Sequence, residues 1–123
     1  MANLLLVDDS NLTLKRMKRA FEEAGHTVSM ANNGREALEV VGDSNPFDVI
    51  VSDVHMPEMT GLELVEALRK KGIEGPIVVC TADLQETTKE KALQLGANKV
   101  LNKPDLYTSE KVQKQMNELL KDQ

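Results

Sequence analysis

Short apolar runs alternate with helical patterns along the whole chain, and this alternation constrains the fold more than any other feature. Turn signals such as Asn33-Gly34 and Gly75-Pro76 separate the segments. Strands and helices that alternate five times predict an open, mostly parallel sheet with helices on both faces. The expected strands are 4–7, 27–31, 49–52, 77–80 and, more weakly, 99–101.

Apolar residues at helical spacing predict a helix after each expected strand. Capping candidates precede three of these helices: Ser10 or Asn11, Thr60, and Thr108 with Ser109. Gly96 is the expected C-terminal cap of the fourth helix. The predicted class is an α/β fold with a doubly wound, five-stranded parallel sheet, (βα)5, in one domain over residues 1–123.

Composition narrows the classes of function. The net charge of −5 offers no general electrostatic reason to bind nucleic acid. A single cysteine, Cys80, excludes an internal disulfide, is expected in the core, and suits a reducing cytoplasm. The N-terminus lacks the features of a signal peptide, and no apolar stretch approaches membrane-spanning length. We therefore expect a cytoplasmic protein without membrane insertion.

Chemically active residues follow four of the five expected strands. Asp8 and Asp9 follow the first, Asp53 the third, Thr81 the fourth and Lys103 the fifth. Ligands of open α/β sheets bind beyond the carboxyl ends of the strands, near the point where the strand order reverses. Three carboxylates, one hydroxyl and one ammonium are therefore expected at one edge of the sheet.

This set of groups suits a divalent cation and a phosphoryl group. Carboxylate oxygens, waters and phosphate oxygens are the ligands that Mg²⁺ prefers. The cation and Lys103 would leave room for one dianionic group, to which Thr81 could donate a hydrogen bond. Asp53 alone follows a middle strand, which makes it the natural nucleophile, since carboxylates serve as phosphoryl acceptors. An ordinary strand-end carboxylate is the plainer interpretation of Asp53.

The ordered motifs "LLLVDDS", "VSDVHMPEMTGLEL", "VVCTAD" and "NKP" resemble the CheY-like receiver domains of bacterial two-component response regulators. The resemblance covers essentially the whole chain and implies a flavodoxin-like fold. It implies that Asp53 accepts a phosphoryl group from the phosphohistidine of a histidine kinase or from a small phosphodonor. The expected activity is confined to the protein's own phosphorylation and autodephosphorylation, so the protein is not expected to be an enzyme.

The resemblance also implies how the site works. Asp9 would bind Mg²⁺ directly, Asp8 largely through water, and the main-chain carbonyl of His55 would be a further ligand. Thr81 would move to hydrogen-bond the phosphoryl group. Lys103 would pair with the phosphate, and the peptide bond between Lys103 and Pro104 is expected to be cis.

Two positions depart from the family pattern. Val100 stands where many members carry an aromatic residue three positions before the lysine. Asp105 stands where many carry phenylalanine after the lysine-proline pair. An aromatic rotamer switch is therefore not expected in its usual form, and backbone shifts in residues 82–90 are the expected alternative. Nothing in the sequence shows that Tyr107 replaces the missing ring.

Two further features carry open alternatives. The side chains of His55 and Asp83 are either spectators or modulators of the lifetime of the acyl phosphate. The first helix is rich in cations, which form either a solvated face or a docking face for an acidic kinase or phosphotransfer partner. These cations are Lys15, Arg16, Lys18 and Arg19.

The leading hypothesis is a phosphorylation-activated switch that changes its binding to a separate output protein, with a role in chemotaxis or motility control as one setting. Its partners would be a histidine kinase or phosphotransfer protein, an output protein on the face formed by the fourth helix, the last strand and the fifth helix, and a phosphatase. A relay intermediate is one alternative. A Mg²⁺-dependent aspartyl-phosphate phosphohydrolase of the haloacid dehalogenase type and a degenerate binding module are two others.

Overall fold

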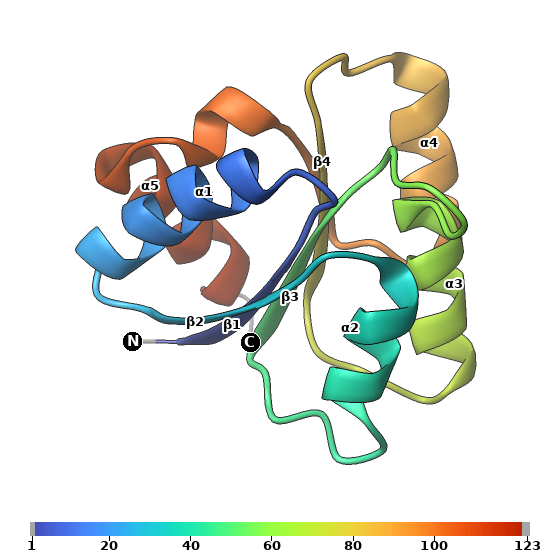
Figure 1. The fold of residues 1–123 in the computed structure, drawn as a ribbon. Coiled ribbons are helices and arrows are strands. Elements are labelled where there is room, and N and C mark those ends of the chain that lie inside the picture. The colour runs from blue at the N-terminus through green and yellow to red at the C-terminus, as the bar shows by residue number, and fades with distance from the viewer. Residues whose placement is uncertain (1, 122–123) are drawn as a thin grey trace.

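The sheet has the predicted parallel architecture. The computed structural model describes residues 2–121. Five parallel strands form one sheet in the order β2-β1-β3-β4-β5 (Figure 1). The strands are β1 (Asn3–Val7), β2 (Thr27–Ala31), β3 (Val49–Asp53), β4 (Ile77–Thr81) and β5 (Lys99–Asn102). β3, β4 and β5 each extend one residue beyond the predicted end, so Asp53 and Thr81 are the last residues of their strands.

Helices cover both faces of the sheet, as predicted. Figure 1 shows α1 and α5 together on one face and α2, α3 and α4 on the other. The α-helices are α1 (Asn11–Glu23), α2 (Gly34–Val41), α3 (Gly61–Lys70), α4 (Glu86–Leu95) and α5 (Ser109–Leu120). A short 3₁₀ helix, η1 (Lys103–Leu106), joins β5 to α5 and was not predicted. None of the described helices is both long and apolar enough to cross a membrane.

The alternating sides of each strand divide the hydrophobic core into two layers. In β1, Leu4 and Leu6 pack with residues of α1 and α5, whereas Leu5 and Val7 pack with residues of α2 and α3. All residues of β3 and β4 are buried, which explains why these strands are nearly continuous apolar runs. Cys80 lies in the first of these layers, as predicted.

Local capping explains where most helices begin. Ser10 accepts a hydrogen bond from Thr13 N at the start of α1, and Thr60 forms a reciprocal capping box with Glu63 at the start of α3. Thr108 caps α5 in the same way. Gly96 ends α4 with φ of 118°, a left-handed conformation that glycine adopts without steric cost. The capping predictions at these four positions are confirmed.

The prediction of a cis bond before Pro104 is wrong. Among the described residues no peptide bond is cis. Pro104 instead lies in the first turn of η1, where its fixed φ suits a helical start and its missing N–H costs no hydrogen bond. The chain therefore turns away from the sheet edge through a short helix and not through a cis peptide.

Candidate functional site

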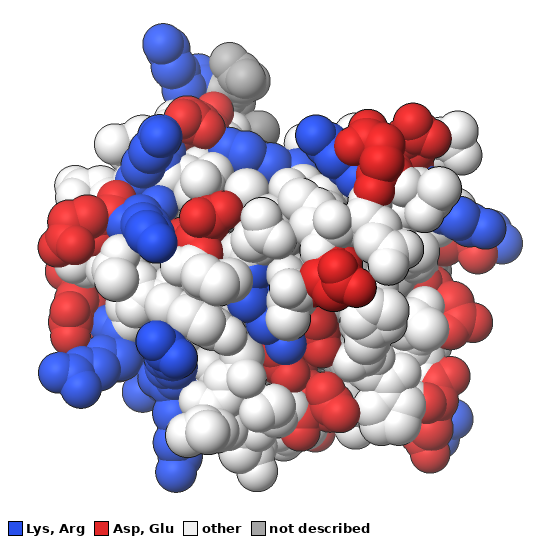
Figure 2. Space-filling view, turned by 90° about the horizontal axis from the view of Figure 1, so that it is seen from above, with Lys and Arg blue, Asp and Glu red and all other residues white. Residues whose placement is uncertain are grey.

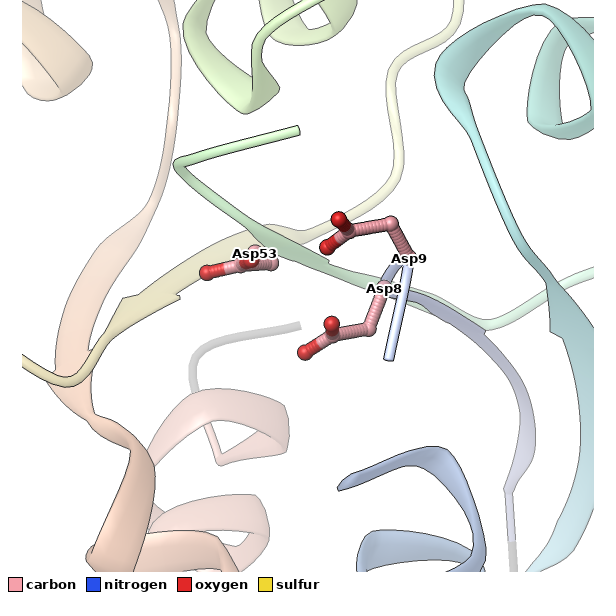
Figure 3. Close-up of side chains that lie close together, drawn as sticks. All are labelled: Asp8, Asp9 and Asp53. Atoms are coloured by element: carbon pink, nitrogen blue, oxygen red, sulfur yellow. The ribbon is translucent and has the colours of Figure 1, made fainter. Parts of the chain in front are cut away.

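The topology brings the predicted acidic residues together. β1 and β3 are neighbours in the sheet, and the chain leaves them in opposite directions, toward β2 and toward β4. Asp8 and Asp9 follow the end of β1 and Asp53 ends β3, so the three carboxylates converge (Figure 3). One oxygen from each lies within 4.8 Å of the others. The predicted cluster at the switch point is thus present.

Two of the three carboxylates are buried beside a single ammonium. Asp8 is fully buried, Asp53 is 4% exposed, and Asp9 is exposed at the mouth of the site. Lys103 Nζ lies 2.9 Å from Asp8 Oδ2 and 3.3 Å from Asp53 Oδ1. Because one cation faces three carboxylates, the cluster retains an excess of negative charge. Buried charge of this kind is costly unless a further cation compensates it.

The close approach of these charges shifts the pKa values of Asp53 and Lys103. Burial raises the pKa of Asp53, and the nearby charge of Asp8 raises it further, while Lys103 acts in the opposite direction. Burial lowers the pKa of Lys103, but its contacts with Asp8 and Asp53 outweigh burial, so the net direction is upward. Lys103 therefore stays charged at neutral pH. The Asp53 carboxylate is the destabilised member of the pair.

Backbone contacts position the two buried carboxylates. Ser10 N donates to Asp8 Oδ1 at 2.9 Å, and Asp8 N donates to Ala31 O at 3.1 Å. After β3 the chain turns sharply, and Gly61 N donates to Val54 O at 2.8 Å. A Cβ atom at Gly61 would overlap the carbonyl oxygen of Asp53. The start of α3 can approach the strand end closely because residue 61 has no side chain.

The donor set fits a hard divalent cation. Asp8 Oδ2 is buried and contacts the ammonium of Lys103 at 2.9 Å. Asp9 and Asp53 supply further carboxylate oxygens around it. Mg²⁺ takes oxygen ligands, retains several waters and commonly binds through one or two carboxylates. The cluster has the oxygen ligands and the excess negative charge that such an ion requires.

Thr81 lies on the neighbouring strand but is bonded to its own loop. Its side chain is fully buried at the end of β4. Thr81 Oγ1 accepts a hydrogen bond from Asp83 N at 3.2 Å and lies 3.4 Å from Asp83 O. The hydroxyl is thus held by the backbone of residue 83, and Gln85 Nε2 donates to Asp83 Oδ2 at 3.3 Å. His55 and Asp83 are both exposed.

The two departures from the family pattern have structural counterparts. Val100 is buried in the core layer beneath α4. Leu106 is fully buried, next to the position where Asp105 replaces the usual aromatic residue. Tyr107 lies on the opposite side, with the guanidinium carbon of Arg16 4.1 Å from its ring centre. The Tyr107 ring thus packs on the α1 side of the molecule.

The sequence predicted the charged residues of the site but not the backbone contacts that position them. Lys103, Asp8 and Asp53 meet as predicted. The Ser10 N–H contact was missed, although a donor two residues after a strand-end aspartate is a recognisable Asx turn. The tight approach of Gly61 to Asp53 had no sequence signal beyond the glycine itself.

Comparison with known proteins agrees with this geometry. Residues 4–117 match the family model described as the response regulator receiver domain. The response regulator MprA of Mycolicibacterium vanbaalenii is 35% identical over 118 residues, covering 96% of this chain and 50% of that protein. The response regulator SaeR of Staphylococcus aureus is 34% identical over 104 residues, covering 85% of this chain and 45% of that protein. The chain thus spans about half the length of these relatives.

Solved structures show the same likeness. The chemotaxis protein CheY4 of Vibrio cholerae superposes with a TM-score of 0.87 at 36% identity, covering 97% of this chain and 98% of that one. The receiver domain of the Francisella response regulator 1452 gives a TM-score of 0.86 at 31% identity, covering 99% and 98% of the two chains. With its parallel sheet, its strand-end carboxylates and its lysine at one edge, this chain belongs to the family of response regulator receiver domains.

Proposed function

We propose that this protein is a phosphorylation-controlled switch that accepts a phosphoryl group on Asp53. The observation that carries the proposal is the buried carboxylate of Asp53, which faces Lys103 Nζ at 3.3 Å beside two further carboxylates. Such a site disfavours three negative charges together unless a cation joins them. Receiver family membership supports the same chemistry.

In the proposed reaction a carboxylate oxygen of Asp53 attacks the phosphorus atom of the donor. A P–O bond to Asp53 forms as the bond to the donor's leaving group breaks, and the product is an acyl phosphate. Lys103 would stay charged and pair with the new phosphoryl oxygens. The charge of the transferring group is spread over its oxygens, so positioning and positive charge supply most of the catalysis.

The proposed cofactor is Mg²⁺. Asp9 and Asp53 would hold it directly, Asp8 largely through water, and the main-chain carbonyl of His55 would be a further ligand. When bound, the ion would neutralise charge on the carboxylates and on the transferring phosphoryl group. The excess of carboxylate charge around the ammonium of Lys103 supports this assignment.

Switching would begin at Thr81. To donate to a phosphoryl oxygen, its hydroxyl must give up its donation to Asp83 O at 3.4 Å. That change would release the short loop at 82–85 before α4, and Val100 offers no aromatic ring to move with it. We therefore propose that backbone movement in residues 82–90 carries the signal. The exposed side chains of His55 and Asp83 are proposed to set the lifetime of the acyl phosphate.

The proposed phosphodonors are a histidine kinase or a phosphotransfer protein, which would approach the edge where α1 begins. Figure 2 views this edge and shows several Lys and Arg side chains over α1 at the lower left. Lys18 and Arg19 pair within the helix with Glu22 and Glu23, which matches a solvated face. Leu12 is 80% exposed one turn before Arg16, and this apolar and cationic pair supports docking of an acidic partner.

The proposed output surface is the face formed by α4, β5 and α5, where a separate partner or phosphatase would bind. Leu93 on α4 is 43% exposed there, and Lys99 of β5 pairs with Glu118 of α5 at 2.6 Å. The likeness to a chemotaxis protein over 98% of its chain supports a role in motility control.

Intact-mass measurement after incubation with acetyl phosphate and Mg²⁺ tests the proposal. We expect the protein to gain one phosphoryl group, Asp53→Asn to gain none, and excess EDTA to suppress the gain. Asp43→Asn, at a fully exposed carboxylate, is the matched control and should gain the group normally. A folded parent protein that binds Mg²⁺ but gains no mass would contradict phosphorylation at Asp53.

A further inference from the structure

We infer that Arg69 fastens the C-terminal end of α4, so that phosphorylation displaces only the N-terminal half of this helix. Arg69 is then a positioning residue that makes α4 pivot about Gly96. This inference rests on the proposed phosphorylation of Asp53. It adds that the contacts of Arg69 confine the resulting movement to one end of α4. The phosphorylation-sensitive part of the proposed output surface becomes residues 86–90, while 92–97 stay in place.

The guanidinium of Arg69 donates to four acceptors, two in the loop at 73–75 and two at residues 96 and 98. Its Nε donates to Gly96 O at 3.0 Å, and one terminal nitrogen donates to Ile73 O at 2.6 Å and Gly75 O at 2.9 Å. The other terminal nitrogen donates to Asn98 Oδ1 at 2.8 Å. This planar fork therefore ties the end of α3, the loop before β4 and the end of α4 into one unit.

The contact extends into the sheet. Asn98 Oδ1 also accepts from Ile77 N at 2.9 Å, and Asn98 N donates to Ile77 O at 2.7 Å. β4 and β5 are joined at this point, just before both strands enter the core. Through Asn98, Arg69 connects the end of α4 to the amino ends of β4 and β5, which pair with each other in the sheet.

The helix end is built around the arginine. Gly96 adopts φ of 118°, and Ala97 N donates back to Ala92 O at 3.0 Å to close the last turn. A Cβ atom at Gly96 would lie 2.7 Å from Arg69 Cγ, so the stem of the arginine packs against the glycine backbone. Polar and packing contacts thus act at the same place.

The other end of α4 has few restraints. Gln85, its N-cap residue, makes no side-chain cap hydrogen bond, whereas Ser10, Asn33, Thr60 and Thr108 cap the other four α-helices described. Ala92 is the one buried residue of α4, and it lies in the C-terminal half. Residues 86–90 therefore rest on the sheet without a fully buried anchor.

Thr81 connects this loose end to the phosphorylation site. Its hydroxyl holds the backbone of Asp83, and α4 begins three residues later. When that hydroxyl moves, the loop and the first turn of α4 are free to shift, whereas the Arg69 contacts at the other end are untouched. A helix held at one end and released at the other tilts instead of translating.

Hydrogen–deuterium exchange of the full chain, with and without Mg²⁺ and acetyl phosphate, tests this inference. Intact mass on the same samples reports the phosphorylated fraction. In the parent protein we expect phosphorylation to change amide exchange at residues 86–90 by at least about fivefold and at 92–97 by less than about twofold. Without phosphorylation, 92–97 should already be the more protected half.

Arg69→Met, which keeps an apolar stem and removes every donor, should raise exchange at 92–97 by about tenfold and let the phosphorylation response spread over the whole helix. Arg69→Lys should give an intermediate increase in exchange, because its ammonium can retain part of the contact. This variant tests the inference if Arg69→Met does not fold. Arg19→Met, at an exposed arginine of α1, is the matched control. Phosphoryl uptake should be unchanged in all three.

The outcomes separate the two proposals. If the parent gains the phosphoryl group and all of α4 responds equally, the pivot is wrong. If Arg69→Met and Arg69→Lys both respond at 86–90 alone, Arg69 is not the restraint. If no phosphoryl group is gained, the proposed function fails, and the protection of 92–97 in the parent and variants still tests the contact of Arg69 with α4.

Discussion

The two edges of the sheet are built in opposite ways. At the carboxyl edge, Asp8 and Asp53 are buried, and the ammonium of Lys103 contacts both carboxylates. At the amino edge, Arg69 donates to the carbonyl oxygens of Ile73 and Gly75, and Asn98 Oδ1 accepts from Ile77 N. Asn3 N there donates to Asp48 Oδ2 at 2.8 Å.

This difference indicates that the carboxyl edge, which carries the candidate site, is the less stable of the two edges. The amino edge has matched donors and acceptors, which stabilise the loops at little electrostatic cost. The carboxyl edge concentrates like charges that are favourable only when a cation and a phosphoryl group can join them. Removing a buried charge at the carboxyl edge and removing a hydrogen-bond acceptor at the amino edge should therefore change the free energy of unfolding in opposite directions.

The largest effect is expected at the amino edge. Asn98→Ala removes the acceptor shared by Ile77 N and the guanidinium of Arg69, and it should lower the free energy of unfolding by about 2 kcal/mol in urea titration. Asn98→Asp keeps an acceptor for both donors and should lose much less. Equal stability of the alanine variant and the parent would show that this edge is not held by these bonds.

At the carboxyl edge, Asp53→Asn should raise the free energy of unfolding by about 1 kcal/mol at pH 7 in the presence of EDTA. The pKa of Asp53 is raised in the folded protein above its usual 3.8. As pH rises past 3.8, the unfolded chain loses this proton first, so the carboxylate destabilises the fold progressively until pH exceeds the raised pKa.

The gain from Asp53→Asn should therefore be full only above the raised pKa of Asp53 and disappear as pH falls to 3.8. Urea titrations at several pH values measure it, with the exposed Asp43→Asn as a control that should show no such gain. A variant that is less stable than the parent at pH 7 would mean that the contact with Lys103 outweighs burial and repulsion, and the contrast between the edges would fail.

The smallest effect is expected from Thr81→Val. The hydroxyl contacts only the backbone of Asp83, at 3.2 Å or more, and valine keeps the branched shape that a strand accommodates. We expect a loss of less than about 1 kcal/mol, because Asp83 is exposed and its N–H can bond to water instead. Phosphoryl uptake should persist, while the change in exchange at residues 86–90 should shrink. A loss above about 2 kcal/mol would assign the hydroxyl a structural role.

The site was predictable because parallel topology converts chain position into spatial position. Asp8, Asp53 and Lys103 each follow an apolar run, and parallel strands place all such positions at one edge. Arg69 carried no comparable signal. In sequence it is one cation among several near a helix end, and its acceptors come from residues 73, 75, 96 and 98, which meet only in the folded chain.

The expected cis bond before Pro104 failed for a related reason. The motif "NKP" allows either isomer, because the preference of an X–Pro bond for trans is small. In the structure the chain continues from Pro104 into a 3₁₀ turn, with Leu106 fully buried. The dipeptide pattern by itself does not specify the isomer.

By itself, the sequence determined the alternation of strands and helices, the caps at Ser10, Thr60 and Thr108, and the edge on which the charged residues lie. Periodicity and capping act over a few residues, so they can be recognised along the chain. Tertiary structure alone decided that Asp8 is fully buried, that Tyr107 stacks on Arg16, and that Arg69 holds one end of α4. Burial and long-range hydrogen bonds depend on which distant segments come into contact in the folded chain. The pattern of side chains within one segment does not specify those contacts.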